Sequence, residues 1–339
     1  MRPPSPPGDM DIADVRGYAL SSPIEPVQAR EFHGGVRRLH KRDVVLVVVE
    51  TVDGARGIAT AGASSSAMRE YFQGDSQSTF ADVVNGEVAD ALEGETVREF
   101  EEAHRRIDRL DMPAKLRHEA VSAVDVALHD LRGRQAGASV AELLAEEHGT
   151  EIARDLPLYA SAGMYMEPEG YADQAEIIDR LGFQGYKYRP GIGPRRDRET
   201  IDLLAERVDC AVMADAHTWW KTKGGYDEET IPELVEYAGE KGAYWVEEPV
   251  APDNYDGYRQ LAGLAPLAGG ESEESPKGLV ALGETGAVSF LQGDVRHHRG
   301  YTGTWEGVSF CEGRDVQFVP HNFGTWLGLV ASVVQGWLR

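Results

Sequence analysis

The sequence predicts an α/β protein in which a (β/α) barrel follows a smaller α+β domain. Near Leu156 the chain begins a strict alternation of strand-like and helix-like segments, which is typical of a parallel barrel. Nearly every predicted strand in this part ends on a polar or charged residue. A doubly wound sheet is the structural alternative, but it would gather its ligands at one switch point. Functional groups at so many strand ends therefore favour the barrel.

Residues 14–150 form the predicted α+β domain, because strand-like segments come first and helical segments follow. Up to about Gly62, β-branched residues dominate, and an Asp-Gly turn after residues 43–51 predicts a hairpin. The period then becomes helical, most clearly over residues 115–136, where apolar residues recur on one helix face. The proline-rich residues 1–13 are predicted to be a flexible tail.

Residues 151–339 form the predicted barrel domain. Its strands are short and apolar, and helical stretches such as residues 168–181 and 232–241 lie between them. The strands are predicted at residues 157–163, 185–189, 211–215, 244–247, 267–271, 290–294 and 317–321.

Three acidic residues mark the ends of successive predicted strands. Asp215, Glu247 and Glu271 are spaced like consecutive βα units, so a parallel barrel would bring their side chains to one rim. Pro249 cannot donate to a sheet hydrogen bond and therefore ends the strand beside Glu247. Converging hard oxygen ligands suit Mg²⁺ better than zinc or a redox metal. We expect Mg²⁺ on these three carboxylates, with Glu248 supporting the site or pairing with a cation.

Two cations lie at the end of the second predicted strand of the barrel. Lys187 and Arg189 are two residues apart, so strand alternation places both side chains on one face. A lysine beside a guanidinium and a divalent cation would have its pKa lowered, which is what a general base needs. The pair is therefore predicted to belong to the site.

Two histidines and an aspartate lie at other strand ends. His217 follows Asp215 by two residues and points to the same side, although an ordinary hydrogen-bonded histidine is an equal alternative there. Asp294 ends the sixth predicted strand, and His321 ends the seventh. A carboxylate bonded to one imidazole nitrogen raises the basicity of the other nitrogen. Asp294 and His321 are therefore candidates for proton transfer.

The composition is strongly acidic. Asp and Glu number 57 against 34 Lys and Arg, which gives a net charge of −23. Nucleic acids and anionic membrane surfaces would repel such a chain, so we expect neither as a partner. Only seven of the basic residues are lysines. An acidic, lysine-poor surface suits a protein kept soluble in concentrated salt, where screening removes self-repulsion. A halophilic source is the resulting hypothesis.

Targeting and redox features are sparse. Cys210 and Cys311 lie in apolar segments and are expected to be reduced thiols. No apolar run is long enough to cross a bilayer, and the N-terminus lacks the apolar core of a signal peptide. These features predict a cytoplasmic location.

From about Asp14 to the C-terminus the chain resembles the enolase superfamily, specifically its mandelate racemase subgroup. Any one of the matching motifs is a weak signal, but together they are specific. The motifs are K-Y-R at 187–189, D-A-H at 215–217, E-E-P at 247–249, G-G-E at 269–271, D-V-R-H-H-R-G-Y-T-G from Asp294 and P-H at 320–321.

The resemblance implies a modified TIM barrel, (β/α)₇β, beneath an N-terminal α+β capping domain. It implies Mg²⁺ on the three strand-end carboxylates. It also implies Lys187 as a base on one face of the substrate and an Asp294–His321 dyad on the other. Arg189 stands where many relatives have a second lysine, so Lys187 is either an active base or only an electrostatic partner. Whether Lys187 or His321 abstracts the proton stays open.

The chemistry implied by the resemblance is removal of the proton α to a carboxylate, through an enediolate that Mg²⁺ stabilises. Sugar-acid dehydratases of this group place an acidic histidine two residues after the first metal ligand, where this chain has His217. This favours loss of water from an aldonate or aldarate to give a 2-keto-3-deoxy acid. A racemase, epimerase or cycloisomerase is the alternative, and a non-catalytic metal-binding protein is the least favoured reading.

Relatives continue past the dyad histidine to close the barrel, whereas this chain stops at Arg339. We therefore expect the sequence to be truncated there and the barrel domain to be incomplete, with loss of the closing segment as the alternative. Relatives are often dimers or octamers, so we expect a homo-oligomer. Substrate choice is expected to depend on capping-domain loops at residues 20–24 and 62–66.

Overall fold

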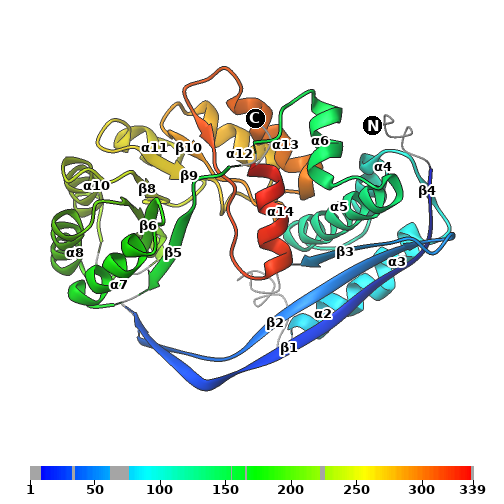
Figure 1. Cartoon of the computed structure of the whole chain (residues 1–339), viewed down its shortest axis with the longest axis horizontal. Helices are drawn as coiled ribbons and strands as arrows, with labels where there is room; N and C mark the ends of the chain where they lie inside the picture. The colour runs from blue at the N-terminus through cyan, green and yellow to red at the C-terminus, as the bar shows by residue number, and fades with distance from the viewer. Residues whose placement is uncertain are drawn as a thin grey trace.

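The computed structural model describes residues 9–32, 35–61, 76–153, 155–164, 166–221 and 226–336. Figure 1 shows two parts. An N-terminal part holds two long strands and the helices beside them, and a C-terminal part holds short strands with helices outside them.

The N-terminal part contains an antiparallel sheet in the order β3-β2-β1-β4. The predicted hairpin is confirmed, because β2 pairs with β3 across a turn at Gly54, whose φ of +83° glycine adopts without strain. The strands are β1 (Met10–Phe32), β2 (Gly35–Thr51), β3 (Arg56–Ala61) and β4 (Thr96–Val97).

Helices pack on this sheet, and the long helix predicted over residues 115–136 is confirmed as α5. It approaches β3 closely: a Cβ on Gly57 would lie 1.9 Å from the Ala127 carbonyl oxygen, so only glycine allows this contact. The helices are α2 (Ser76–Val83), the π-helical η1 (Val84–Val88), α3 (Ala89–Leu92), α4 (Phe100–Ile107), α5 (Ala114–Ala136) and α6 (Val140–His148).

The C-terminal part is a parallel sheet of seven strands in chain order from β5 to β11, as the barrel prediction requires. Asp215 on β7 is paired in register with Glu247 on β8. The strands are β5 (Tyr159–Met164), β6 (Gly185–Arg189), β7 (Ala211–Asp215), β8 (Trp245–Glu247), β9 (Leu267–Gly269), β10 (Phe290–Leu291) and β11 (Gln317–Phe318).

Helices alternate with these strands and lie outside the sheet (Figure 1). The helix after β5 begins at Pro168, a residue preorganised for the first helical position. The helices are α7 (Pro168–Arg180), α8 (Pro194–Arg207), α9 (His217–Lys221), α10 (Thr230–Glu240), α11 (Tyr255–Leu261), α12 (Pro276–Glu284), α13 (Gly300–Cys311) and α14 (Trp326–Gly336).

Strand alternation sets both the core and the site. Met213 and Trp245 are buried together with Ala268 in one apolar cluster. Each of the first two lies two residues before a predicted metal ligand, and residues two apart share a strand face. The same inner face therefore carries an apolar layer first and the carboxylates next.

The structure corrects two of the predicted boundaries. Met10 and Ile12 were predicted in the tail, but they are buried residues of β1 because its apolar face packs into the capping core. Residues 20–24, predicted as a loop, lie within β1, which pairs with β2 there apart from a register shift beginning at Pro23. Residues 1–8 and 62–66 lie outside the described part of the chain.

None of the described helices is long and apolar enough to span a bilayer. Cys210 and Cys311 are free thiols.

Candidate active site

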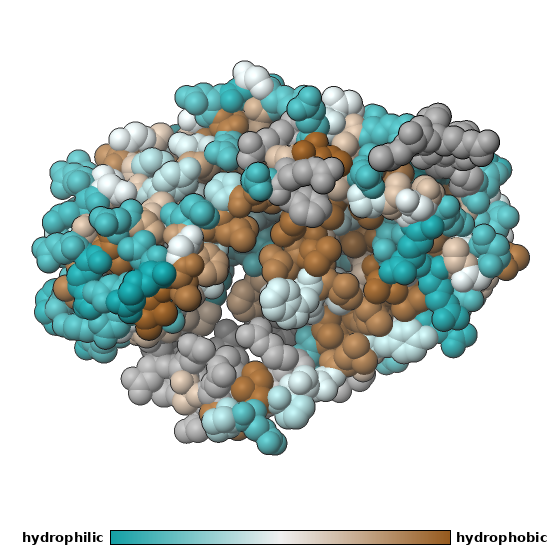
Figure 2. All heavy atoms as spheres, viewed as in Figure 1, coloured by the Kyte–Doolittle hydropathy of each residue, from teal (hydrophilic) through white to brown (hydrophobic). Residues whose placement is uncertain are grey.

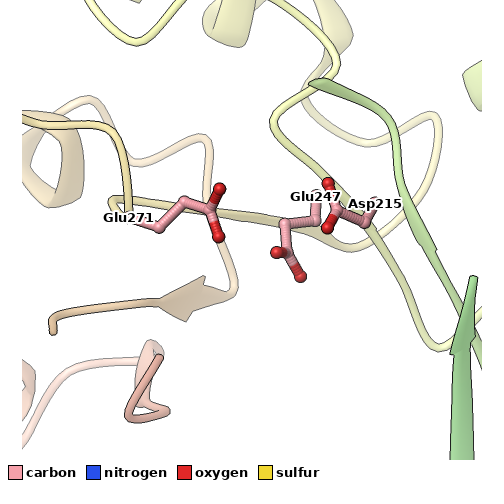
Figure 3. A group of neighbouring side chains, drawn as sticks. All are labelled: Asp215, Glu247 and Glu271. Carbon is pink, nitrogen blue, oxygen red and sulfur yellow. The ribbon is translucent and has the colours of Figure 1, made fainter. Parts of the chain in front are cut away.

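The three predicted metal ligands lie together at the carboxyl ends of the barrel strands (Figure 3). One carboxylate oxygen from each of Asp215, Glu247 and Glu271 lies within 4.8 Å of the other two. Asp215 and Glu247 are fully buried, and Glu271 is nearly so. Negative charges this close and this buried repel one another unless cations lie among them.

The donor set fits a hard divalent cation. Asp215 Oδ1 and Glu271 Oε2 are buried oxygens without a hydrogen-bond partner in the described part of the chain. His217 Nδ1 lies 2.6 Å from the first oxygen and His321 Nε2 lies 2.6 Å from the second, but neither contact has hydrogen-bond geometry. Buried carboxylate oxygens left in this way are suitable ligands for Mg²⁺.

Glu247 is held by neutral and charged donors. Its Oε2 accepts hydrogen bonds from Trp245 Nε1 at 3.0 Å and from Gln292 Nε2 at 2.8 Å. Its Oε1 accepts one from Lys187 Nζ. Burial raises the pKa of Glu247, and the ammonium of Lys187 opposes that rise. Sequence reasoning missed Trp245 and Gln292. Their only signal in the sequence was position. Trp245 lies two residues before Glu247 on the same strand face, and Gln292 lies two residues before Asp294.

Lys187 and Arg189 both turn towards the carboxylates, as alternation along β6 predicted. Lys187 Nζ lies 3.6 Å from Asp215 Oδ2, and Arg189 Nε donates to the same oxygen at 2.8 Å. Burial disfavours the Lys187 ammonium, but Glu247 and Asp215 outweigh it and raise the pKa of Lys187. The expected lowering is therefore not produced by these protein groups, because carboxylates outnumber the neighbouring guanidinium.

His217 begins α9, directly after β7. Its Nδ1 faces Asp215 Oδ1 and lies 3.9 Å from Glu271 Oε1, with 16% of the side chain exposed. The imidazole therefore stands at the edge of the carboxylate cluster with part of its surface accessible, as an acid that reaches a bound molecule must.

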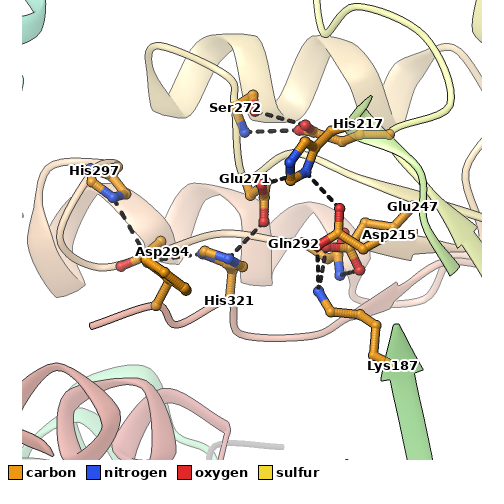
Figure 4. Close-up of polar contacts among 12 residues, drawn as sticks. Lys187, Asp215, His217, Glu247, Glu271, Ser272, Gln292, Asp294, His297 and His321 are labelled. Atoms are coloured by element: carbon orange, nitrogen blue, oxygen red, sulfur yellow. Dashed lines mark hydrogen bonds and ion pairs between the residues drawn. The ribbon is translucent and has the colours of Figure 1, made fainter. Parts of the chain in front are cut away.

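The predicted dyad is formed. His321 Nδ1 donates to Asp294 Oδ2 at 2.9 Å, which leaves Nε2 facing Glu271. Burial opposes the imidazolium, yet Glu271 and Asp294 together raise the pKa of His321 to about 10. Arg296 holds Asp294 through both carboxylate oxygens. Lys187 and His321 approach the carboxylates from different sides (Figure 4).

The dyad residues lie just beyond the strands predicted to carry them. β10 ends at Leu291 and β11 ends at Phe318, so Asp294 and His321 belong to the loops that follow. Backbone hydrogen bonds nevertheless continue beyond β11, from Val319 N to the Leu291 carbonyl at 2.9 Å and from His321 N to the Gly293 carbonyl at 2.8 Å.

Glu248 does not pair with a cation among the described residues. It accepts hydrogen bonds from Ser272 N at 2.9 Å and from Ser272 Oγ at 2.7 Å, and burial raises its pKa to about 8. Its φ of +44° is rare for a residue with a side chain. Glu248 thus links the loop after β8 to the loop after β9. It does not belong to the cluster of three carboxylates.

His298, for which the sequence indicated no role, is a buried neutral histidine. Its Nδ1 accepts from Asp294 N at 2.9 Å and its Nε2 donates to the Glu273 carbonyl at 3.0 Å. Burial lowers the pKa of His298 to about 4. It fixes the backbone of Asp294.

Two family models match the chain. Residues 170–335 match the enolase C-terminal domain-like model, and residues 21–145 match the mandelate racemase / muconate lactonizing enzyme N-terminal domain. The chain belongs to the enolase superfamily, in its mandelate racemase and muconate lactonizing enzyme group. The resemblance seen in the sequence motifs is therefore confirmed.

Individual relatives differ in their activities. The chain is similar to D-galactarolactone cycloisomerase of Agrobacterium fabrum, with 30% identity over 63% of this chain and 56% of that protein. It is also similar to D-gluconate dehydratase of Thermoproteus tenax, with 27% identity over 60% of this chain and 42% of that protein. The chain spans about half the length of the curated relatives it matches.

Solved structures share the fold. An enolase from Bradyrhizobium, complexed with magnesium and mandelic acid, aligns with a TM-score of 0.75 and 23% identity, covering 93% of this chain and 82% of that one. The capping sheet and the seven-stranded parallel sheet are thus those of the superfamily's modified barrel.

Proposed function

We propose that the protein is a Mg²⁺-dependent enzyme that removes the proton α to the carboxylate of a sugar acid. Water is then eliminated, which yields a 2-keto-3-deoxy acid. The observation that carries this proposal is the cluster of Asp215, Glu247 and Glu271 with Lys187 on one side and His321 on the other (Figure 4).

The proposed metal ligands are Asp215, Glu247 and Glu271. When bound there, Mg²⁺ supplies electrostatic stabilisation of the second negative charge that develops on the substrate carboxylate. The magnesium reported in the Bradyrhizobium structure supports this choice of ion. The remaining steps are proton transfers, which the side chains around the cluster perform.

The α proton is removed by the base that lies on the same face of the substrate as that proton. Lys187 serves one configuration at the α carbon, and His321 serves the opposite configuration. Asp294 keeps the Nδ1 of His321 protonated, so its Nε2 exchanges the proton. Trp245 and Gln292 hold Glu247 in place while this occurs.

Elimination then needs an acid at the β carbon. His217 lies at the edge of the cluster and is partly exposed. We assign it the proton that the departing hydroxyl takes up as the C–O bond breaks and the electron pair of the enediolate forms the new C=C bond. The enol product tautomerises to the 2-keto acid. Relatives named as D-gluconate, L-rhamnonate and D-xylonate dehydratases support this outcome.

The second candidate function is a racemase, epimerase or cycloisomerase acting through the same enediolate. Bases on both faces would permit return of the proton to the opposite face. The matches to D-galactarolactone cycloisomerase and to an N-succinyl-L-Arg/Lys racemase support it. The two candidates share every step up to the enediolate.

A substrate panel separates these functions. Aldonates and aldarates are incubated with protein and Mg²⁺ in D₂O, and both 2-keto acid formation and deuterium uptake at the α carbon are measured. The dehydratase proposal expects keto acid from at least one substrate, and activity that is lost on chelation with EDTA. Deuterium exchange without keto acid would reject the dehydratase and favour the second candidate.

A further inference from the structure

The turn that carries Asp294 is held by the capping domain as well as by the barrel. Three polar side chains of α5 reach this turn: His297 Nδ1 donates to Glu119 Oε1 at 2.6 Å, and Arg299 N donates to Ser122 Oγ at 2.9 Å. Thr302 Oγ1 donates to Asp125 Oδ2 at 2.5 Å.

The contacts form an ordered series. Glu119, Ser122 and Asp125 are three residues apart on α5, and residues at this spacing are neighbours on a helix surface. All three are buried, in a helix whose other buried positions are mainly apolar. A buried polar row costs stability unless each member is paired. Here the partners are His297 and Arg299 of the turn and Thr302 in the first turn of α13.

Glu119 differs from the other two because it brings a buried charge close to the dyad. It is 1% exposed, and its Oε2 has no hydrogen-bond partner among the described residues. It forms an ion pair with His297, whose Nε2 lies 4.0 Å from Asp294 Oδ2. Burial opposes the imidazolium, but Glu119 and Asp294 raise the pKa of His297.

The charges therefore alternate from the capping domain to the carboxylate cluster. Glu119 faces His297, His297 faces Asp294, and Asp294 accepts the hydrogen bond of His321. His321 in turn faces Glu271. Figure 4 shows His297, Asp294 and His321 in this order.

We propose that Glu119 is a positioning residue for the Asp294–His321 dyad: acting from the capping domain through His297, it aims the imidazole of His321. The inference rests on the proposed function, because it assigns the dyad to proton transfer. It adds a requirement that the capping domain completes the proton-transfer machinery in addition to covering the site.

A purely structural role for Glu119 would predict only a loss of domain docking. Asp108 offers the matched comparison, because it joins the same two domains by a bidentate pair with Arg299, at 2.9 and 2.7 Å, without touching His297 or Asp294. Glu119→Gln removes one carboxylate charge with little change of shape, and Asp108→Asn does the same at the neighbouring contact. His297→Gln removes the link from the barrel side.

The test uses two readouts on the full chain with Mg²⁺. With the best substrate of the panel, Glu119→Gln and His297→Gln are expected to lower kcat about ten- to hundredfold with KM changed less than about threefold, as is typical when a supporting carboxylate–histidine contact is removed. Asp108→Asn is expected to retain kcat within about twofold. Equal kcat losses in Glu119→Gln and Asp108→Asn would overturn the inference.

The second readout does not need turnover. In histidine-labelled protein, the ring ¹⁵N resonances of His321 are expected to shift in Glu119→Gln and to stay in place in Asp108→Asn. Unchanged His321 resonances in folded Glu119→Gln protein would overturn the inference. Wild type that neither exchanges the α proton nor eliminates water would reject the proposed function instead, and the resonances would still decide the role of Glu119.

Discussion

At the scale of single residues, the site depends on buried charges that are satisfied only as a group. Glu247 lies between Lys187, Trp245 and Gln292, so its carboxylate is directed by three donors. Its neighbour Glu248 has the same residue type but is bonded to Ser272. One adjacent pair therefore contains a proposed metal ligand and a loop-bridging residue.

Glu247→Gln is expected to abolish Mg²⁺-dependent turnover, by roughly a thousandfold or more, because a neutral amide loses the ligand charge and the partner of Lys187. Calorimetric Mg²⁺ titration and steady-state kinetics measure this. Glu248→Gln is the matched control: since the pKa of Glu248 is raised to about 8, its carboxyl is mostly neutral at pH 7, and Gln resembles that form. Equal losses in the two variants would contradict the assignment of Glu247.

His217→Asn is expected to separate the two halves of the reaction. Exchange of the α proton in D₂O should persist, because Lys187 and His321 remain. Elimination of water should fall by about a hundred- to ten-thousandfold, which is the usual effect of a lost general acid. Mass spectrometry of recovered substrate and a keto-acid assay measure the two rates. A parallel fall of both rates would place His217 in another role.

At the scale of elements, the sequence patterns succeeded where local chemistry decides the structure. β6 and β7 occupy the predicted residues, and α5 begins one residue before its predicted start. β10 and β11 are shorter than predicted, although backbone hydrogen bonds between the two segments continue at Val319 and His321. The carboxylate cluster and the dyad could be predicted, since strand ends of parallel units converge.

The contact between α5 and the turn that carries Asp294 could not be predicted in this way. Glu119 and His297 are 178 residues apart, and neither belongs to a repeating pattern that relates them. On α5, Glu119 looks like any acid of an acidic chain, because its burial follows only from the docking of the two domains. The sequence indicated no role for His297 for the same reason.

Asp125 provides a prediction for α5. It is fully buried and close to His104 and His129, at 2.8 and 3.3 Å, while Thr302 donates to it. Asp125→Asn is expected to cost about 3 kcal/mol of unfolding free energy, since an amide NH₂ would face these donors. Urea unfolding at pH 7 measures the loss. The exposed Asp108→Asn change, by comparison, should cost below about 1 kcal/mol.

The pKa of Asp125 determines how the loss of unfolding free energy in Asp125→Asn depends on pH. Burial raises the pKa of Asp125, but His129 and His104 more than offset that and lower it. A depressed folded-state pKa contributes stability above the unfolded value, near 3.8, and loses it as pH falls further. The gap between wild type and Asp125→Asn should therefore not narrow between pH 7 and pH 5. Narrowing in that range would contradict an ionised Asp125.

At the scale of the whole molecule, hydrophilic and apolar residues are unevenly distributed over the face shown in Figure 2. Hydrophilic residues cover the outer helices in Figure 2, and apolar residues gather near its centre. Trp326, Leu327, Leu329 and Val330 of α14 are exposed large apolar residues. Homo-oligomerisation stays a prediction, and sedimentation velocity tests it.

The net charge of −23 predicts salt-dependent stability. Self-repulsion destabilises the compact state, and salt screens it, so the unfolding free energy should rise between low and molar KCl. Thermal unfolding by circular dichroism at several KCl concentrations measures this, with equal ionic strengths of NaCl as the control for ion identity. A midpoint that stays constant or falls as salt increases would contradict a halophilic adaptation.

The strand order of the parallel sheet has a consequence for how related enzymes diverge in evolution. Lys187, Asp215, Glu247 and Glu271 come from four consecutive strands or their following loops, and one or two helices join each strand to the next. A duplicated gene can therefore exchange one acid or base by altering a single segment while the ion-binding scaffold persists. Lineages that lose water, invert a stereocentre or close a lactone can thus arise from one ancestor through small, separable edits.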